Sequence, residues 1–235
     1  MQMNAALREA EFGNPAQARE KTTSALALAS TQEVQTEAAL AFARAGDSAR
    51  ARRITEDLAR QFPMDSLLNR YWLPTLRAAI EINRHNPAKA IDLLQAAAPY
   101  ELGEAPPLAG TLYPVYIRGQ ANLLLHQSSE AAAEFQKFLD HRGIVTSFPL
   151  GALAHLGLAR AYAMEAGLDF GQGTSAPVGV SATRRTVPAR GASNAAADAV
   201  AKARTAYQDF LALWKDADPG IPVLIAAKSE YAKLK

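Results

Sequence analysis

The chain has 235 residues, with 25 basic and 23 acidic side chains and a net charge of +2. That balance excludes a dedicated nucleic-acid binder, which would carry a clear basic excess. Cysteine is absent, so disulfides and thiolate chemistry are excluded. No apolar run reaches the ~18 residues that a membrane-spanning helix needs. Alanine and leucine dominate and alternating β-branched runs are nearly absent, so the composition predicts an all-α fold.

The helical pattern divides into five hairpins of two amphipathic helices each, joined by a short turn in the first four. A kink or break is expected in the third hairpin at Pro74, because proline cannot continue a helix interior. A helix at the end of the chain should cover the apolar face of the last hairpin. The hairpins are expected at residues 3–29, 32–63, 65–99, 111–141 and 149–215, with the capping helix at 219–234, and together they form one domain over residues 1–235.

Small residues recur where two helix backbones would approach closely. Ala6 and Ala39 are 33 residues apart, as are Ala18 and Ala51. This shared spacing is the strongest repeat signal in the chain. The later hairpins carry Ala78, Ala90, Gly119, Ala131, Ala159 and Ala203 at the corresponding places.

Residues 167–195 lack hydrophobic periodicity and are rich in Gly, Ser, Thr and Pro. They are expected to be a flexible insertion in the turn of the fifth hairpin. The run ATRRTVPAR within them is basic, so it could bind an acidic partner. Thr183 and Thr186 are candidate phosphorylation sites because arginines flank them. The alternative is a solvated linker.

The pattern resembles tetratricopeptide repeats, whose 34-residue unit has small residues at positions 8 and 20. The second hairpin matches best, because counting from Gln32 places the expected types at Ala39, Phe42, Gly46, Ala51 and Pro63. The fourth hairpin departs from the pattern, because Asn122 stands where an aromatic residue is expected. The resemblance implies a right-handed solenoid of antiparallel helical hairpins with a C-terminal capping helix.

The resemblance also implies that the first helix of each pair lines a concave groove for a peptide or extended partner segment. Aromatic side chains beside amides and arginines suit such a groove. The lysine and asparagine clamp that some family members use for C-terminal carboxylates is missing. For Trp72 and the tyrosines, burial in the core is the alternative. The candidate groove residues are Thr36, Arg44, Trp72, Thr75, Asn83, Tyr113, Tyr116, Gln120, Leu156 and Arg160.

A narrower resemblance is carried by the runs YWLPTLRAAIEINRHNPAKAIDLL, YPVYIRGQA, AAAEFQKFLDHRGI and AYQDFLALWKDADPGIP. They are similar to the C-terminal repeat region of acidobacterial-type serine/threonine protein kinases, a region also seen behind winged-helix DNA-binding domains. This implies the sensing or docking part of a bacterial signalling protein. The sequence holds no kinase motif, so the chain itself is not expected to be an enzyme.

The four histidines, His85, His126, His141 and His155, have no metal-ligand spacing, and no nucleophile and base are placed to converge. We therefore expect no metal, no cofactor and no catalytic residue. The predicted function is a non-catalytic protein–protein interaction scaffold, and the alternative is a self-association module that dimerises its parent protein. A cytoplasmic location is expected, or an extracytoplasmic one if the parent is a membrane receptor kinase.

Overall fold

The computed structural model describes residues 2–103, 112–145, 148–168, 170 and 192–234. Every regular element in these ranges is a helix, which confirms the all-α prediction. The elements are α1 (Gln2–Phe12), α2 (Pro15–Leu28), α3 (Gln32–Arg44), α4 (Ser48–Gln61), the π-helix η1 (Leu68–Trp72), α5 (Leu73–Asn83), α6 (Pro87–Leu94), the 3₁₀ helix η2 (Ala98–Tyr100), α7 (Tyr113–Leu124), α8 (Ser128–Asp140), α9 (Arg142–Val145), α10 (Leu150–Glu165), α11 (Ala192–Leu213) and α12 (Pro222–Ala232).

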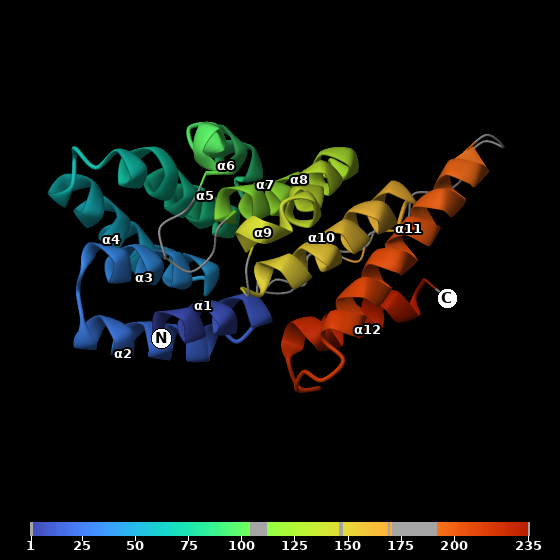
Figure 1. Ribbon diagram of the computed structural model, residues 1–235, viewed down its shortest axis with the longest axis horizontal. Coiled ribbons are helices and arrows are strands. Elements are labelled where there is room, and N and C mark those ends of the chain that lie inside the picture. Colours follow the sequence, from blue (N-terminus) through green and yellow to red (C-terminus); the bar gives the residue numbers. More distant parts are fainter. Residues whose placement is uncertain (1, 104–111, 146–147, 169, 171–191, 235) are drawn as a thin grey trace.

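Ten of the described helices form five antiparallel pairs, α1/α2, α3/α4, α5/α6, α7/α8 and α10/α11, which follow one another in Figure 1. Four of the pairs span ranges within two residues of those expected, whereas α5/α6 begins eight residues later and ends five residues earlier than the expected 65–99. Most of the insertion predicted at 167–195, with Thr183 and Thr186, lies outside the described residues. The alanines at the predicted close approaches are fully buried, namely Ala6, Ala18, Ala39, Ala51, Ala78, Ala90, Ala131, Ala159 and Ala203.

The same backbone turn ends the first helix of every pair. One residue of each turn has a positive φ, a conformation that normally favours glycine. The next amide donates to the carbonyl five residues back, as Asp47 does to Phe42 at 2.8 Å and Gln127 to Asn122 at 2.9 Å. This bond satisfies a carbonyl at the helix end that has no partner within the helix. The positive-φ residues are Gly13, Gly46, His85, His126 and Gly167.

The third pair is irregular, as Pro74 predicts. The chain forms the wide turn η1 before α5 begins at Leu73. Proline has no N–H to donate and its ring crowds the carbonyl four residues earlier, so a regular α-helix cannot continue through it. The sequence did not predict the short helices η2 and α9.

The first helices of the pairs pack against one another along the chain, α1 on α3, α3 on α5, α5 on α7 and α7 on α10. In the first four pairs the second helix packs between two first helices, as α2 does between α1 and α3, and α6 between α5 and α7, whereas α11 packs between α10 and α12. The first helices therefore form the inner layer and the second helices the outer layer. Grooves floored by inner helices remain between neighbouring outer helices.

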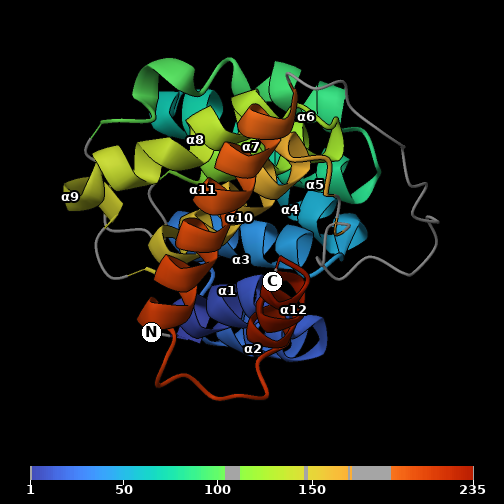
Figure 2. The same cartoon turned by 90° about the vertical axis from the view of Figure 1, so that its right-hand side faces the viewer.

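The last described helix, α12, packs against both α11 and α1, and Figures 1 and 2 both show it beside α1. The Phe12 and Trp214 rings meet edge to face, with centroids 4.9 Å apart. A Cβ placed on Gly13 would lie 3.0 Å from Cβ of Pro222. The two ends of the described helical stack are therefore in direct contact.

Candidate functional site

The inner layer carries an ionic network that joins three helices. Both carboxylate oxygens of Glu11 on α1 accept hydrogen bonds from Arg44 on α3, at 2.6 and 2.9 Å. Arg44 also donates to Gln120 on α7 at 2.8 Å, and its guanidinium lies 5.6 Å from the centre of the Tyr116 ring. Burial alone would lower the pKa of Arg44, but the charge and hydrogen bonds of Glu11 raise it above its ordinary value.

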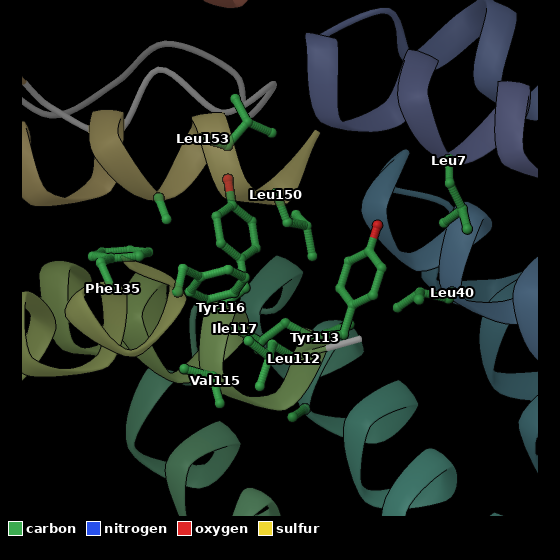
Figure 3. Close-up of a cluster of buried hydrophobic side chains, with 14 of the residues drawn as sticks. Leu7, Leu40, Leu112, Tyr113, Val115, Tyr116, Ile117, Phe135, Leu150 and Leu153 are labelled. Carbon is green, nitrogen blue, oxygen red and sulfur yellow. The ribbon is translucent and has the colours of Figure 1, made fainter. Parts of the chain in front are cut away.

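Two tyrosines of α7 extend this network in opposite directions. Figure 3 shows the Tyr113 hydroxyl pointing toward the helices that carry Leu7 and Leu40, and the Tyr116 hydroxyl pointing toward α10. The Tyr113 hydroxyl donates to Glu11 at 3.3 Å. Burial and the neighbouring Glu11 charge raise the pKa of both tyrosines above their ordinary value. Both phenols are therefore neutral hydrogen-bonding groups of the interior.

A second network joins α10, α11 and α12. Arg160 donates to both carboxylate oxygens of Glu230, at 3.0 and 2.9 Å. The Tyr207 hydroxyl donates to the same carboxylate at 2.8 Å. Burial and the charge of Glu230 raise the pKa of Tyr207. These bonds attach α12 to the last hairpin.

The remaining predicted groove residues also face internal partners. The Thr36 and Thr75 hydroxyls bond carbonyls of their own helical segments, and Asn83 donates to the carbonyl of Ala43. Trp72 packs on Tyr71, and its indole N–H has no acceptor among the described residues. Leu156 belongs to the core.

The ten predicted residues therefore do not line an open groove, and this corrects the expectation. Thr36, Trp72, Thr75, Tyr113, Tyr116, Gln120 and Leu156 are buried, and the other three bond internal partners. The inner face is filled because α7 reaches α1 and α3 through Tyr113 and Gln120, and because α12 closes onto α1. The structure does bring Arg44, Tyr113, Tyr116 and Gln120 together.

Two accessible hollows lie between outer helices in the described part of the chain. The first is a cavity of about 460 Å³ between α2 and α4, with Phe42 of α3 at its floor. The Arg50 guanidinium covers the Phe42 ring at 4.2 Å and is bonded to Asp47. Arg53 lines the same cavity, is exposed, and has no ion-pair or hydrogen-bond partner in the part of the chain that the structure describes.

The second hollow, of about 520 Å³, lies between α6 and α8 with α7 at its floor. Arg118 at this floor is bonded to Glu101 at 2.7 and 2.8 Å and to Glu134 at 2.8 Å. Burial alone would lower the pKa of Arg118, but hydrogen bonds and charge from these two carboxylates raise it. Asp92 and Glu130 also line this hollow. Its titratable lining is therefore mainly acidic, whereas that of the α2–α4 groove is mainly basic.

Sequence reasoning missed both outer grooves because the resemblance directs attention to the first helices. Two signals were present in the sequence. The basic cluster Arg50, Arg52 and Arg53 on one helix marks the first groove. Asn122, the departure from the repeat pattern, marks the second.

No group of three or more His, Cys, Asp or Glu side chains that could hold a metal ion is found among the described residues. The helices in those ranges are also too short or too polar to cross a membrane. Comparison of the chain with protein-family models, curated proteins and solved structures finds no match.

Proposed function

We propose that this chain is a non-catalytic protein–protein interaction scaffold that binds an extended acidic segment of a partner in the groove between α2 and α4. The observation that carries the proposal is Arg53, an exposed guanidinium without a partner among the described residues, on the wall of a cavity that Leu26 and Ile54 also line with aliphatic surface. Such a groove offers an apolar surface for one side chain of the partner and a cation for its carboxylate.

The inner face is the less favourable surface for a partner in the state that the structure describes. A segment entering there would have to displace the bonds of Arg44 to Glu11 and of Arg160 to Glu230. Breaking a buried ion pair leaves uncompensated charge, which costs about 3–5 kcal/mol. The outer grooves require no such displacement.

The finer architecture and the biological setting are part of the same proposal. The paired helices, the identical turns and the buried small residues support a tetratricopeptide-like solenoid. The likeness to kinase-associated repeat regions supports a docking or sensing role in a bacterial signalling protein. That setting rests on the sequence resemblance alone.

Binding should depend on Arg53 and not on its neighbour. In fluorescence anisotropy with a labelled peptide of alternating leucine and glutamate, Arg53→Glu is expected to weaken binding by about tenfold or more, because the reversal replaces attraction by repulsion. Arg52→Glu is the matched control, since Arg52 is exposed on the same helix but does not line the cavity. Equal effects of the two substitutions would contradict the assignment of the groove.

Self-association is a second candidate function, favoured by the position of the exposed apolar side chains. The large ones among the described residues all lie at or beside connections between successive helical pairs, at the end of α11 or near the start of α12. Self-association through them predicts a dimer in light scattering at high concentration, and Met64→Ser with Leu67→Ser should shift it to monomer. A strict monomer would reject this candidate. The residues are Leu28, Met64, Leu67, Tyr100, Leu102, Leu213 and Ile225.

A further inference from the structure

The α2–α4 groove and the α6–α8 groove each lie beside a turn of the same type, but the residues at their floors differ. Phe42 lies nine residues before Ala51, and Asn122 lies nine residues before Ala131. The carbonyls of Phe42 and Asn122 each accept the backbone bond that closes their turn. An amide therefore replaces an aromatic ring at the floor of the α6–α8 groove.

The Asn122 side chain lacks the hydrogen-bond partner that this position has in two other hairpins. The first and third hairpins carry Glu9 and Glu81 there, and these carboxylates accept hydrogen bonds from Asn14 and Asn86 at 2.9 and 2.8 Å. In the fourth hairpin Gln127 starts the second helix, and no side-chain bond joins it to Asn122.

Asn122 is 6% exposed and lines the cavity, and its side chain has no hydrogen-bond partner among the described residues. The Asn122 amide is not among the fully buried unpaired polar groups of the described residues, so its oxygen and nitrogen reach the open hollow and can form hydrogen bonds there. An unpaired amide at the floor of a hollow therefore points to a ligand with hydrogen-bonding groups.

The rim of the groove carries carboxylates that are not neutralised. Asp92 on α6 and Glu130 on α8 are both exposed, and neither has an ion pair or a hydrogen bond in the described ranges. Glu130 takes the place that Arg50 has in the α2–α4 groove, since each precedes the small residue of its helix. Arg118 at the floor does not offset these charges, because Glu101 and Glu134 already bind it.

The rest of the lining suits a side chain with an apolar stem. Ile91, Leu125 and Ala133 contribute aliphatic surface to the same cavity. Arginine combines an aliphatic stem with a planar cation that has five N–H donors. Asp92, Glu130 and the Asn122 carbonyl oxygen can all accept from such donors.

We propose that the groove between α6 and α8 binds an arginine-containing segment of a partner protein, with Asp92 and Glu130 holding the guanidinium and Asn122 accepting a hydrogen bond at the floor. This site goes beyond the proposed function, because it is a second surface that selects the opposite charge. One chain could then hold an acidic and a basic segment at the same time.

The test uses the full chain and a fluorescein-labelled peptide of alternating alanine and arginine, measured by anisotropy at low ionic strength. A peptide with citrulline in place of arginine is the matched ligand control, since citrulline keeps the shape and removes the charge. We expect the citrulline peptide to bind about tenfold more weakly or worse, and added salt to weaken arginine-peptide binding. Equal binding of the two peptides, or no binding of the arginine peptide, would overturn the proposal.

Substitutions in the chain test whether the arginine peptide binds in the α6–α8 groove. Asp92→Asn with Glu130→Gln should weaken arginine-peptide binding by about tenfold, and both positions are exposed, so folding should be unaffected. Glu56→Gln with Asp216→Asn is the control, because these exposed carboxylates lie outside the cavity. Asn122→Leu should weaken binding further, with circular dichroism confirming that the variant is folded. Equal effects of the two double variants would overturn the assignment.

Two further measurements distinguish the two groove proposals from each other, and a separate partner from the chain's own basic segment. Arg53→Glu should leave arginine-peptide binding unchanged, because Arg53 lines the α2–α4 groove and not the α6–α8 groove. The two groove proposals can therefore fail independently of each other. If the chain binds the peptide only after Arg184, Arg185 and Arg190 are replaced by glutamine, its own basic segment is the occupant and a separate partner is rejected.

Discussion

Replacing Glu11 by leucine is expected to lower the free energy of unfolding by about 3–5 kcal/mol. The Glu11 side chain is 1% exposed and that of Arg44 is 9% exposed, so the substitution leaves a buried guanidinium without its carboxylate. The loss should be seen as a lower midpoint in urea denaturation followed by circular dichroism.

Two companion variants show whether the loss comes from the uncompensated charge. Glu11→Leu combined with Arg44→Met removes both charges and should recover much of the stability, because similar apolar residues often replace a buried ion pair without loss. Asp57→Asn breaks the more exposed pair with Arg60 and should cost less than about 1 kcal/mol. A Glu11→Leu variant as stable as Asp57→Asn would show that the inner network does not hold α1 to α3.

Replacing Phe135 by alanine is expected to cost about 3–5 kcal/mol, the usual range for emptying a buried aromatic site. The Phe135 ring of α8 lies against two glycines, Gly119 of α7 and Gly157 of α10. A Cβ on either glycine would fall 2.8 or 2.6 Å from ring atoms. The ring therefore fills the space left by two absent side chains.

The energetic coupling between the Phe135 ring and Gly157 can be measured directly. Gly157→Ala in an ordinary helix would stabilise by about 1 kcal/mol, but here the overlap with Phe135 should make it destabilising by about 1–3 kcal/mol. In the Phe135→Ala background the same change should be neutral or stabilising, which a double-mutant cycle in urea would report as a coupling energy. Additive effects would contradict this packing.

The helices and their close approaches could be predicted because they depend on residues near one another in sequence. Proline and glycine at the turns determine where each helix ends, and the alanines seven residues before and five residues after Gly13 and Gly46 determine where a neighbouring helix fits. The same local reasoning predicted the break at Pro74. It did not predict α9 or η2, which are too short to show a period.

Whether the inner face is open to solvent or filled by side chains could not be predicted in the same way. The sequence assigns Arg44, Tyr113 and Gln120 to one side of their helices, but whether that side meets solvent depends on the curvature of the whole stack. Small angles between successive pairs add up, and their sum brings α7 to α1 and α12 to α1. Glu11 was not among the predicted site residues, although it is the centre of the network.

The contact between α12 and α1 also limits how the fold can change in length and how it can unfold. In an open array of helical pairs, each pair touches only its neighbours, so pairs can be added, lost or melted from the ends. Here the first and last helices support each other through Phe12, Trp214, Gly13 and Pro222. Inserting or deleting a pair between α1 and α12 would separate these surfaces. We therefore expect the five described pairs to melt together in one transition.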